Sequence, residues 1–147
     1  MEMGILGLPQ SGKSTLFEIM TGVKVDPARQ ETVVRGQASV PDGRFDRLVE
    51  IYRPAKVSPA KVPFVDVHVA GERPWEAIRQ SLSGTDGLLH VVDGAHPDPE
   101  GQIVAVHEVL ADVDAGDVRE IIAVNKADLA DPEVLDRLQR AYPDVAI

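Results

Sequence analysis

No cysteine occurs among the 147 residues of the chain. This absence excludes disulfide bridges, zinc–thiolate clusters and thiol catalysis, and it suits a cytoplasmic protein. The four histidines are scattered along the chain, so the sequence predicts no zinc site from them either. A chain of this length can bury about two-thirds of the surface that its unfolded form exposes, so a stable core requires neither disulfides nor metal.

Long apolar runs and an excess of basic residues are also missing. No run approaches the ~20 apolar residues of a membrane-spanning helix. Residues 3–8 lead directly into a glycine-rich loop, without the features of a signal peptide. With 24 acidic and 15 basic residues, the formal net charge is −9. Because phosphate neutralisation supplies most of the affinity for nucleic acid, we expect no broad nucleic-acid-binding surface on this acidic chain. From the missing membrane span and signal peptide we expect no membrane contact and a cytoplasmic location.

Short apolar runs alternate with stretches of helical period, which is the pattern of a parallel sheet flanked by helices. We predict one α/β domain over residues 1–147, with a mostly parallel sheet and helices on both faces. The predicted strands are 3–7, 62–67, 88–92, 121–124 and 145–147. The predicted helices are 13–21, 42–53, 75–82, a segment around 103–110, and 131–140. The continuous apolar run Leu88–Val92 predicts a strand at the centre of the sheet.

The segment between the first helix and the second strand is less regular. Residues 24–35 are polar and aperiodic, and we interpret them as a long loop. Val40-Pro41-Asp42 then predicts the start of a helix that ends at Pro54. We expect that helix to turn four apolar side chains inward: Phe45, Leu48, Val49 and Tyr52.

A phosphate-binding loop is predicted where the sequence reads Gly7-Leu8-Pro9-Gln10-Ser11-Gly12-Lys13-Ser14. The segment fits the pattern GxxxxGK[ST] between a predicted strand and a predicted helix, which is the context that the motif requires. The two glycines let the backbone curl so that its N–H groups surround phosphate. We predict that Lys13 reaches the β- and γ-phosphates as the catalytic residue and that Ser14 ligates Mg²⁺. Thr15 would contact the α-phosphate.

Base recognition is predicted at Asn125-Lys126-Ala127-Asp128, directly after the predicted strand 121–124. Open α/β sheets bind their ligands at the carboxyl ends of such strands. The carboxylate of Asp128 can accept both the N1–H and the N2–H₂ donors of guanine, whereas adenine lacks that pair of donors. Lys126 would lie along the base and the phosphate loop, and Asn125 would tie the two loops together. A solvated turn with a helix cap at Asp128 is the alternative.

A magnesium site is predicted from Ser14, Asp66 and Thr32. Asp66 ends the predicted strand 62–67, where nucleotide hydrolases of this class place the acidic residue that holds Mg²⁺ through water. Thr32 is the only threonine in the first long loop. It could complete the set of Mg²⁺ ligands through the order–disorder change that is typical of such switch segments.

The segment that begins at Asp66 corresponds to the second switch of such nucleotide hydrolases, whose usual sequence is Asp-x-x-Gly. Here Val69 occupies the glycine position, and the next glycine is Gly71, two residues further along the chain. Ala70 occupies the position at which Ras-like proteins carry a water-orienting glutamine. His68 and Glu72 are the available substitutes.

Four further residues invite a structural interpretation. His90 lies inside an apolar strand and is predicted to be a hydrogen-bonded core histidine. His96 and His107 are predicted on the surface. Trp75 is the only tryptophan and is predicted to be a packing anchor after the second switch.

These motifs resemble the Obg-related GTPases. Residues 4–9 and 12–17 are similar to the YchF-type branch, as are the segments 40–42, 47–48, 51–54, 57–60 and 64–66. Residues 88–93, 96–98 and Gln102, together with 125–129, are more similar to the HflX-type branch. The resemblance implies a P-loop G domain, Mg²⁺-dependent hydrolysis of GTP, and work on or near the ribosome.

The resemblance also sets expectations for specificity and length. The YchF-type branch often has an altered base-recognition motif and can prefer ATP, but this chain retains Asn125, Lys126 and Asp128, so GTP and GDP are the expected ligands. Obg-related proteins commonly have a hydrophobic residue at the position of the water-orienting glutamine, and Ala70 occupies that position here. Family members have further domains and a base-contacting loop after the last strand. We therefore expect a G domain truncated at its C-terminal end, with weaker guanine affinity than a complete member.

Three functions compete on this basis. The first is a slow Mg²⁺-dependent GTPase that acts with the ribosome. The second is a non-hydrolysing guanine-nucleotide-binding module with a degenerate second switch. A P-loop kinase is disfavoured, because no cluster of arginines is available for a lid over the phosphates.

Overall fold

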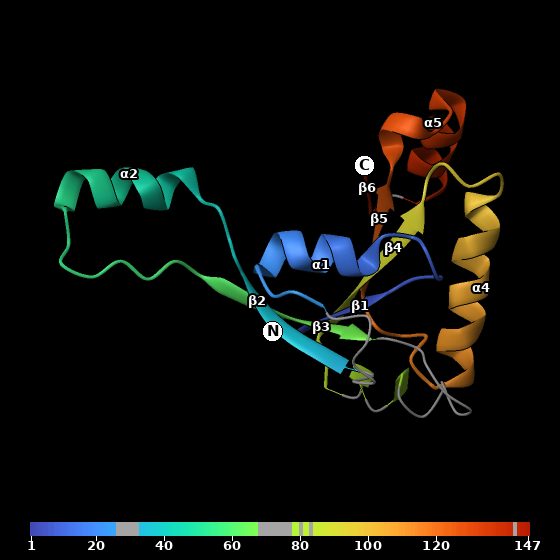
Figure 1. The fold of residues 1–147 in the computed structure, drawn as a ribbon, viewed down its shortest axis with the longest axis horizontal. Helices are drawn as coiled ribbons and strands as arrows, with labels where there is room; N and C mark the ends of the chain where they lie inside the picture. The colour runs from blue at the N-terminus through green and yellow to red at the C-terminus, as the bar shows by residue number, and fades with distance from the viewer. Residues whose placement is uncertain (26–32, 68–77, 80, 83, 143) are drawn as a thin grey trace.

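The computed structural model describes residues 1–25, 33–67, 78–79, 81–82, 84–142 and 144–147. Its centre is a six-stranded sheet with the strand order β2-β3-β1-β4-β5-β6 (Figure 1). All neighbouring strands pair in parallel except β2 and β3, which are antiparallel. The predicted α/β class and the mostly parallel sheet are confirmed.

The strands follow the apolar runs of the sequence closely. They are β1 (Met3–Leu6), β2 (Val33–Ser39), β3 (Lys61–Val67), β4 (Gly87–Asp93), β5 (Glu120–Asn125) and β6 (Val145–Ala146). β1 and β4 occupy the middle of the sheet, and Leu88, Val91 and Val92 of β4 are fully buried. The predicted central strand is therefore confirmed.

Helices cover both faces of the sheet, as expected. Phe17 of α1 (Lys13–Thr21) packs with Ile5 and Val91 on one face. On the other face, Ile103 of α4 (Pro99–Asp112) and Leu138 of α5 (Pro132–Ala141) share a cluster with strand residues of β4 and β5.

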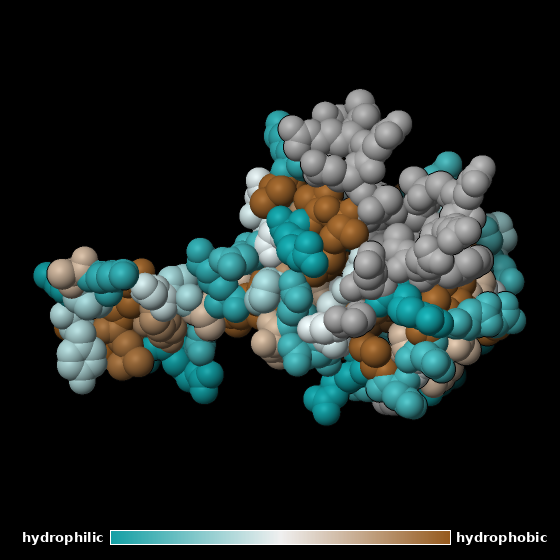
Figure 2. Space-filling model, turned by 90° about the horizontal axis from the view of Figure 1, so that it is seen from below, coloured by the Kyte–Doolittle hydropathy of each residue, from teal (hydrophilic) through white to brown (hydrophobic). Residues whose placement is uncertain are grey.

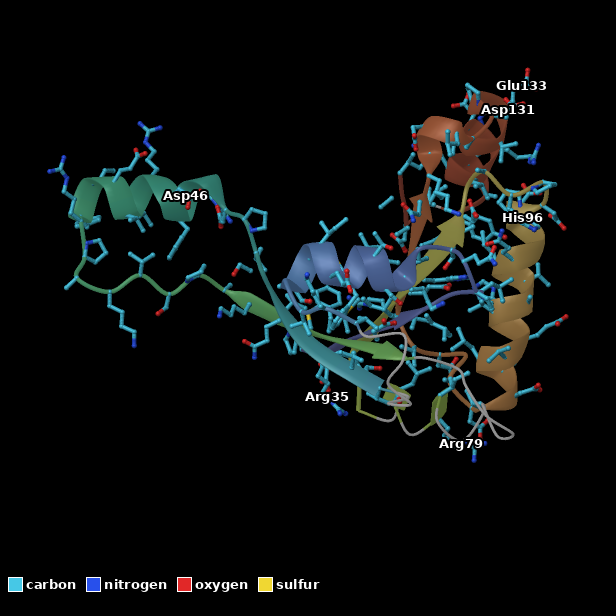
Figure 3. The ribbon with its side chains drawn as sticks, viewed as in Figure 1. Arg35, Asp46, Arg79, His96, Asp131 and Glu133 are labelled. Atoms are coloured by element: carbon cyan, nitrogen blue, oxygen red, sulfur yellow. The ribbon has the colours of Figure 1, made fainter. Side chains whose placement is uncertain are left out.

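The ends of the helices have identifiable causes. α1 ends at Gly22, whose φ of 72° suits glycine. The carboxylates of Asp98 and Asp131 accept backbone hydrogen bonds at the starts of α4 and α5, and a proline follows each of them. Figure 3 labels Asp131 at the start of α5.

The prediction of a loop over residues 24–35 is wrong for its last part. Val33, Val34 and Arg35 belong to β2, which pairs with β3 from Val33 opposite Val67 to Ser39 opposite Lys61. An edge strand is half exposed and carries polar residues on its outer face, so it lacks the apolar run by which a central strand is found.

The helix predicted after Asp42 exists, but its apolar side chains do not point into the core. α2 (Gly43–Tyr52) is capped by Asp42 and ends before Arg53 and Pro54, yet none of its residues is buried. Its apolar positions Leu48, Ile51 and Tyr52 are 52%, 64% and 75% exposed. The helix stands on an arm that projects from the sheet between β2 and β3, and part of its surface is hydrophobic (Figures 1 and 2).

Several predictions fall on residues outside the described part of the chain. These are Thr32, the switch residues His68, Val69, Ala70, Gly71 and Glu72, and the tryptophan Trp75. Among the described helices, none combines the length and the apolar character that crossing a membrane requires.

Candidate nucleotide site

The phosphate-loop motif lies between β1 and α1, at the carboxyl edge of the sheet. Gly12 sits immediately before α1 with a φ of 92°, and its carbonyl accepts the first helical hydrogen bond from Leu16 at 2.9 Å. A Cβ at Gly12 would overlap the side-chain amide of Asn125, and one at Gly7 would overlap the carbonyl oxygen of Val91. Both glycines are therefore required by the close approach of neighbouring strands and loops, in addition to backbone conformation.

The side chain of Lys13 lies against the predicted phosphate loop. Its ammonium group donates to the carbonyl oxygen of Leu8 at 3.1 Å. Burial lowers the pKa of Lys13 from its ordinary value, while the negative charge of Asp66 acts in the opposite direction. A half-buried cation whose hydrogen-bond partner is a loop carbonyl is well placed to exchange that contact for phosphate oxygens.

Asp66 and Ser14 offer the oxygen ligands that Mg²⁺ prefers. Asp66 lies near the end of β3, opposite Ile5 of β1, and its side chain is fully buried. Ser14 is half buried in the first turn of α1. The donor set therefore fits a hard divalent cation, whereas the third predicted ligand, Thr32, lies outside the described residues.

The predicted base-recognition residues contact the phosphate loop directly. The side-chain amide of Asn125 donates to the carbonyl oxygen of Ser11 at 2.9 Å. The ammonium group of Lys126 donates to the carbonyl oxygen of Gln10 at 3.0 Å. The sequence interpretation had Asn125 joining the two loops and Lys126 lying along the base and the phosphate loop. The structure shows the contacts of both side chains with the phosphate loop, and the contact of Lys126 with a base stays a prediction.

Lys126 also makes an ion pair that the sequence analysis missed. Its ammonium group lies 2.6 Å from a carboxylate oxygen of Asp93, at the end of β4. The backbone N–H of Asp93 donates to the side-chain oxygen of Gln102, which is buried in α4. The available signal was position alone, because Asp93 follows a buried strand at the same sheet edge as Asn125.

Asp128 lies in the short 3₁₀ helix η1 (Ala127–Leu129), and its side chain is exposed. Lys126, just before it, has a φ of 57°, so the chain turns sharply after β5. The exposed carboxylate is available to a ligand.

A cavity of about 450 Å³ opens beside the phosphate loop. Lys13 and Ser14 contribute polar groups to its lining, while Ile78 and two valines of α4, Val106 and Val109, contribute apolar surface. The loop is thus open to a ligand of small-molecule size.

No protein-family model matches the chain. The ribosome-binding ATPase YchF of Haemophilus influenzae is 32% identical to it over 121 residues, which cover 76% of this chain and 33% of that protein. YchF of Escherichia coli O157:H7 is 29% identical over 133 residues, with 76% and 37% covered. Obg-like ATPase 1 of Pongo abelii is 25% identical over 150 aligned residues, with 95% and 37% covered.

The chain spans about a third of the length of these curated relatives. All three names agree with the part of the predicted resemblance that concerned the Obg and YchF proteins. The predicted similarity of the second half to the HflX-type branch stays a prediction.

Proposed function

We propose that this chain, whose homologues are YchF and Obg-like ATPases of the Obg/YchF family of P-loop proteins, binds a nucleoside triphosphate with Mg²⁺ and hydrolyses it slowly. We propose residues 1–147 as one nucleotide-binding domain. The observation that carries the proposal is the joining of two loops, because Asn125 and Lys126 both donate to carbonyl oxygens of the phosphate loop. A nucleotide has its phosphates and its base at such a junction.

The phosphate loop is proposed to bind through Gly7, Gly12, Lys13, Ser14, Thr15 and the backbone of the intervening residues Pro9, Gln10 and Ser11. Lys13 would move from the carbonyl oxygen of Leu8 to the β- and γ-phosphates, where its charge stabilises the transferring group. Bound Mg²⁺ would neutralise charge on the phosphate oxygens. Ser14, Asp66 and Thr32 are the proposed residues for holding it.

Guanine is the base that Asp128 supports best. Its carboxylate can accept from N1–H and N2–H₂ together, and an ionised carboxylate has no hydrogen to offer the N1 acceptor of adenine. The relatives that match are named ATPases, so ATP is the second candidate ligand. The two candidates differ at a single edge of the base, which makes Asp128 the residue to test.

The base preference is tested by titrating fluorescent GDP, GTP and ATP into the purified chain with and without Mg²⁺. We expect guanine nucleotides to bind at least about tenfold more tightly than ATP, since each unmatched buried polar group costs on the order of 1–3 kcal/mol. Asp128→Asn should abolish that preference and favour xanthine nucleotides, because its amide can donate to the 2-oxo group. Equal binding of ATP and GTP to the unaltered chain would overturn the guanine assignment.

Hydrolysis is tested separately by phosphate release from the nucleotide that binds best. Lys13→Ala is the control, because it removes the proposed stabilising charge. The names of the relatives favour hydrolysis over a module that only binds. Nucleotide binding without release above the Lys13→Ala background would favour the binding module instead.

A ribosomal partner and a cytoplasmic location complete the proposal. YchF is described as ribosome-binding, and this description supports the same partner here. Cosedimentation with purified ribosomes in the presence of each nucleotide tests it. If the chain sediments to the same extent with and without ribosomes, the proposed ribosomal partner is contradicted.

A further inference from the structure

A second cluster of ionisable side chains lies away from the nucleotide site. Three elements contribute to it, because His90 is on β4, His107 is on α4 and Glu120 begins β5. One carboxylate oxygen of Glu120 lies 2.7 Å from Nδ1 of His90, and the other lies 2.7 Å from Nε2 of His107. The two imidazole rings are 6.2 Å apart between centroids.

The sequence predicted no zinc site, because the histidines are far apart along the chain. The fold changes that expectation by placing two of them on either side of one carboxylate. The three potential ligand atoms all lie within 4.8 Å of one another. Two imidazole nitrogens and one carboxylate oxygen form a ligand set that zinc enzymes use with a water molecule in the fourth position.

We propose that His90, His107 and Glu120 form a binding site for a divalent transition-metal ion of the Zn²⁺ type. An ion about 2.0–2.2 Å from each ligand places tetrahedral ligand atoms about 3.3–3.5 Å apart. In the structure, each imidazole nitrogen lies 2.7 Å from a different oxygen of Glu120, and one ligand atom from each of the three residues lies within 4.8 Å of the others. To admit the ion, the nitrogen and oxygen atoms that now lie 2.7 Å apart would have to separate by about 0.6–0.8 Å.

The burial of each ligand suits this role. The side chain of His90 is fully buried, that of Glu120 is 19% exposed and that of His107 is 43% exposed. The inner ligand is held by the core, while the outer two leave a path for the ion and a place for water. An ion bound here would fasten α4 to β4 and β5.

Metal coordination through Nδ1 of His90 replaces the hydrogen bond that this nitrogen makes with Glu120. Coordination through Nδ1 places the ring hydrogen on Nε2. Among the described residues, Nε2 of His90 has no hydrogen-bond partner. Placing the ring hydrogen on Nε2 therefore disrupts no hydrogen bond of that nitrogen.

This site is chemically and spatially distinct from the proposed magnesium site. Mg²⁺ prefers oxygen ligands, whereas the cluster supplies two nitrogens. Glu120 is the first residue of β5, and Asn125, which contacts the phosphate loop, is the last, roughly 16 Å away at the usual rise per residue of a strand; His90 lies three residues before the end of β4. Metal binding at the cluster can therefore be measured without nucleotide.

The test uses the whole chain, free of nucleotide and of any histidine tag, in buffer containing millimolar Mg²⁺. Zn²⁺ is titrated by calorimetry, and Co²⁺ is titrated by its visible absorption, whose intensity reports tetrahedral coordination. We expect one ion per chain, and a rise in the unfolding temperature that a chelator reverses. His107→Gln and Glu120→Gln should each weaken binding at least about tenfold, since loss even of a residue supporting a ligand commonly costs 10–100-fold.

His96→Gln is the matched control, because His96 is exposed near the start of α4 and its Nδ1 accepts from the N–H of Asp98 (Figure 3). It should bind Zn²⁺ like the unaltered chain. The proposal is overturned if the unaltered chain takes up no Zn²⁺ or Co²⁺, or if His107→Gln binds as tightly as His96→Gln. In either case the cluster is a hydrogen-bonded triad only. The nucleotide titrations do not depend on this outcome, so the two proposals can fail independently.

Discussion

At the scale of single residues, Lys126 joins three parts of the chain. Its ammonium group contacts Asp93 at the end of β4 and Gln10 in the phosphate loop, while its backbone belongs to the turn after β5. Asn125 makes a parallel connection to Ser11. The two halves of the proposed nucleotide site are therefore held together by protein contacts before any ligand binds.

Asp93→Ala should weaken nucleotide binding about tenfold, because the carboxylate of Asp93 holds the ammonium group of Lys126 in place. Removing its carboxylate frees Lys126 to leave the phosphate loop, and hydrogen bonds to charged groups are worth about 1.5–3 kcal/mol. The measurement is the dissociation constant for the preferred nucleotide. Asp112→Ala, at the exposed end of α4, is the control and should bind normally. Unchanged affinity in Asp93→Ala would show that the ion pair does not position Lys126.

At the scale of elements, the arm that carries α2 differs from the rest of the fold. The helices α1, α4 and α5 each bury at least one side chain, whereas α2 buries none. The base of the arm is nevertheless ordered by the β2–β3 ladder, which extends to a hydrogen bond from the N–H of Val40 to the carbonyl oxygen of Ala60. The arm is thus an appendage of a hairpin, and the core does not depend on it.

Replacing residues 41–59 by Asn-Gly should leave the unfolding temperature within about 2 °C of the original and nucleotide affinity unchanged. Val40 and Ala60 already face each other across the hairpin, and Asn-Gly favours a tight turn between antiparallel strands. Changes at surfaces without packing are usually worth under about 0.5 kcal/mol.

Phe17→Ala is the contrasting variant for thermal unfolding. Phe17 is fully buried between α1 and the sheet, and its truncation should cost about 3–5 kcal/mol. A large destabilisation by the arm replacement would mean that α2 contributes to stability through contacts beyond those of the hairpin.

At the scale of the whole molecule, the proposed ligand site lies along one edge of the sheet. β1, β3, β4 and β5 all end there, and the residues that follow or close them include Gly7, Asp66, Asp93 and Asn125. Parallel pairing brings these ends together, so a nucleotide bound there would contact residues at the ends of all four strands. Binding should therefore stabilise the folded chain as a unit.

Saturation with the preferred nucleotide and Mg²⁺ should raise the unfolding temperature by roughly 8 °C. A ligand at a hundredfold excess over its dissociation constant stabilises the folded state by about 2.7 kcal/mol, and for a chain of this size each kcal/mol shifts the transition by about 3 °C. Differential scanning fluorimetry measures the shift. Removal of Mg²⁺ with a chelator should reduce it, and Asp66→Asn should show little response to Mg²⁺. An identical shift with and without Mg²⁺ would contradict the metal assignment.

The sequence by itself determined the class of fold and most of its elements. The central strands are continuous apolar runs, and their helices have capping residues that can be recognised locally, such as Gly22 and Asp131. The position of the phosphate-loop motif between a strand and a helix was also predictable, because its residues are adjacent in the chain and their spacing is specific; that it binds phosphate stays a prediction. Local signals were sufficient wherever the physical cause lay within a few residues.

Only the tertiary structure decided the rest. The sequence predicted that α2 would face inward, since periodicity reports an apolar face but not whether another element covers it. It missed the ion pair of Asp93 with Lys126 and the meeting of His90, His107 and Glu120, because each joins residues from different strands and helices. Such contacts follow from the order and register of the sheet, which place distant residues side by side without leaving a local pattern.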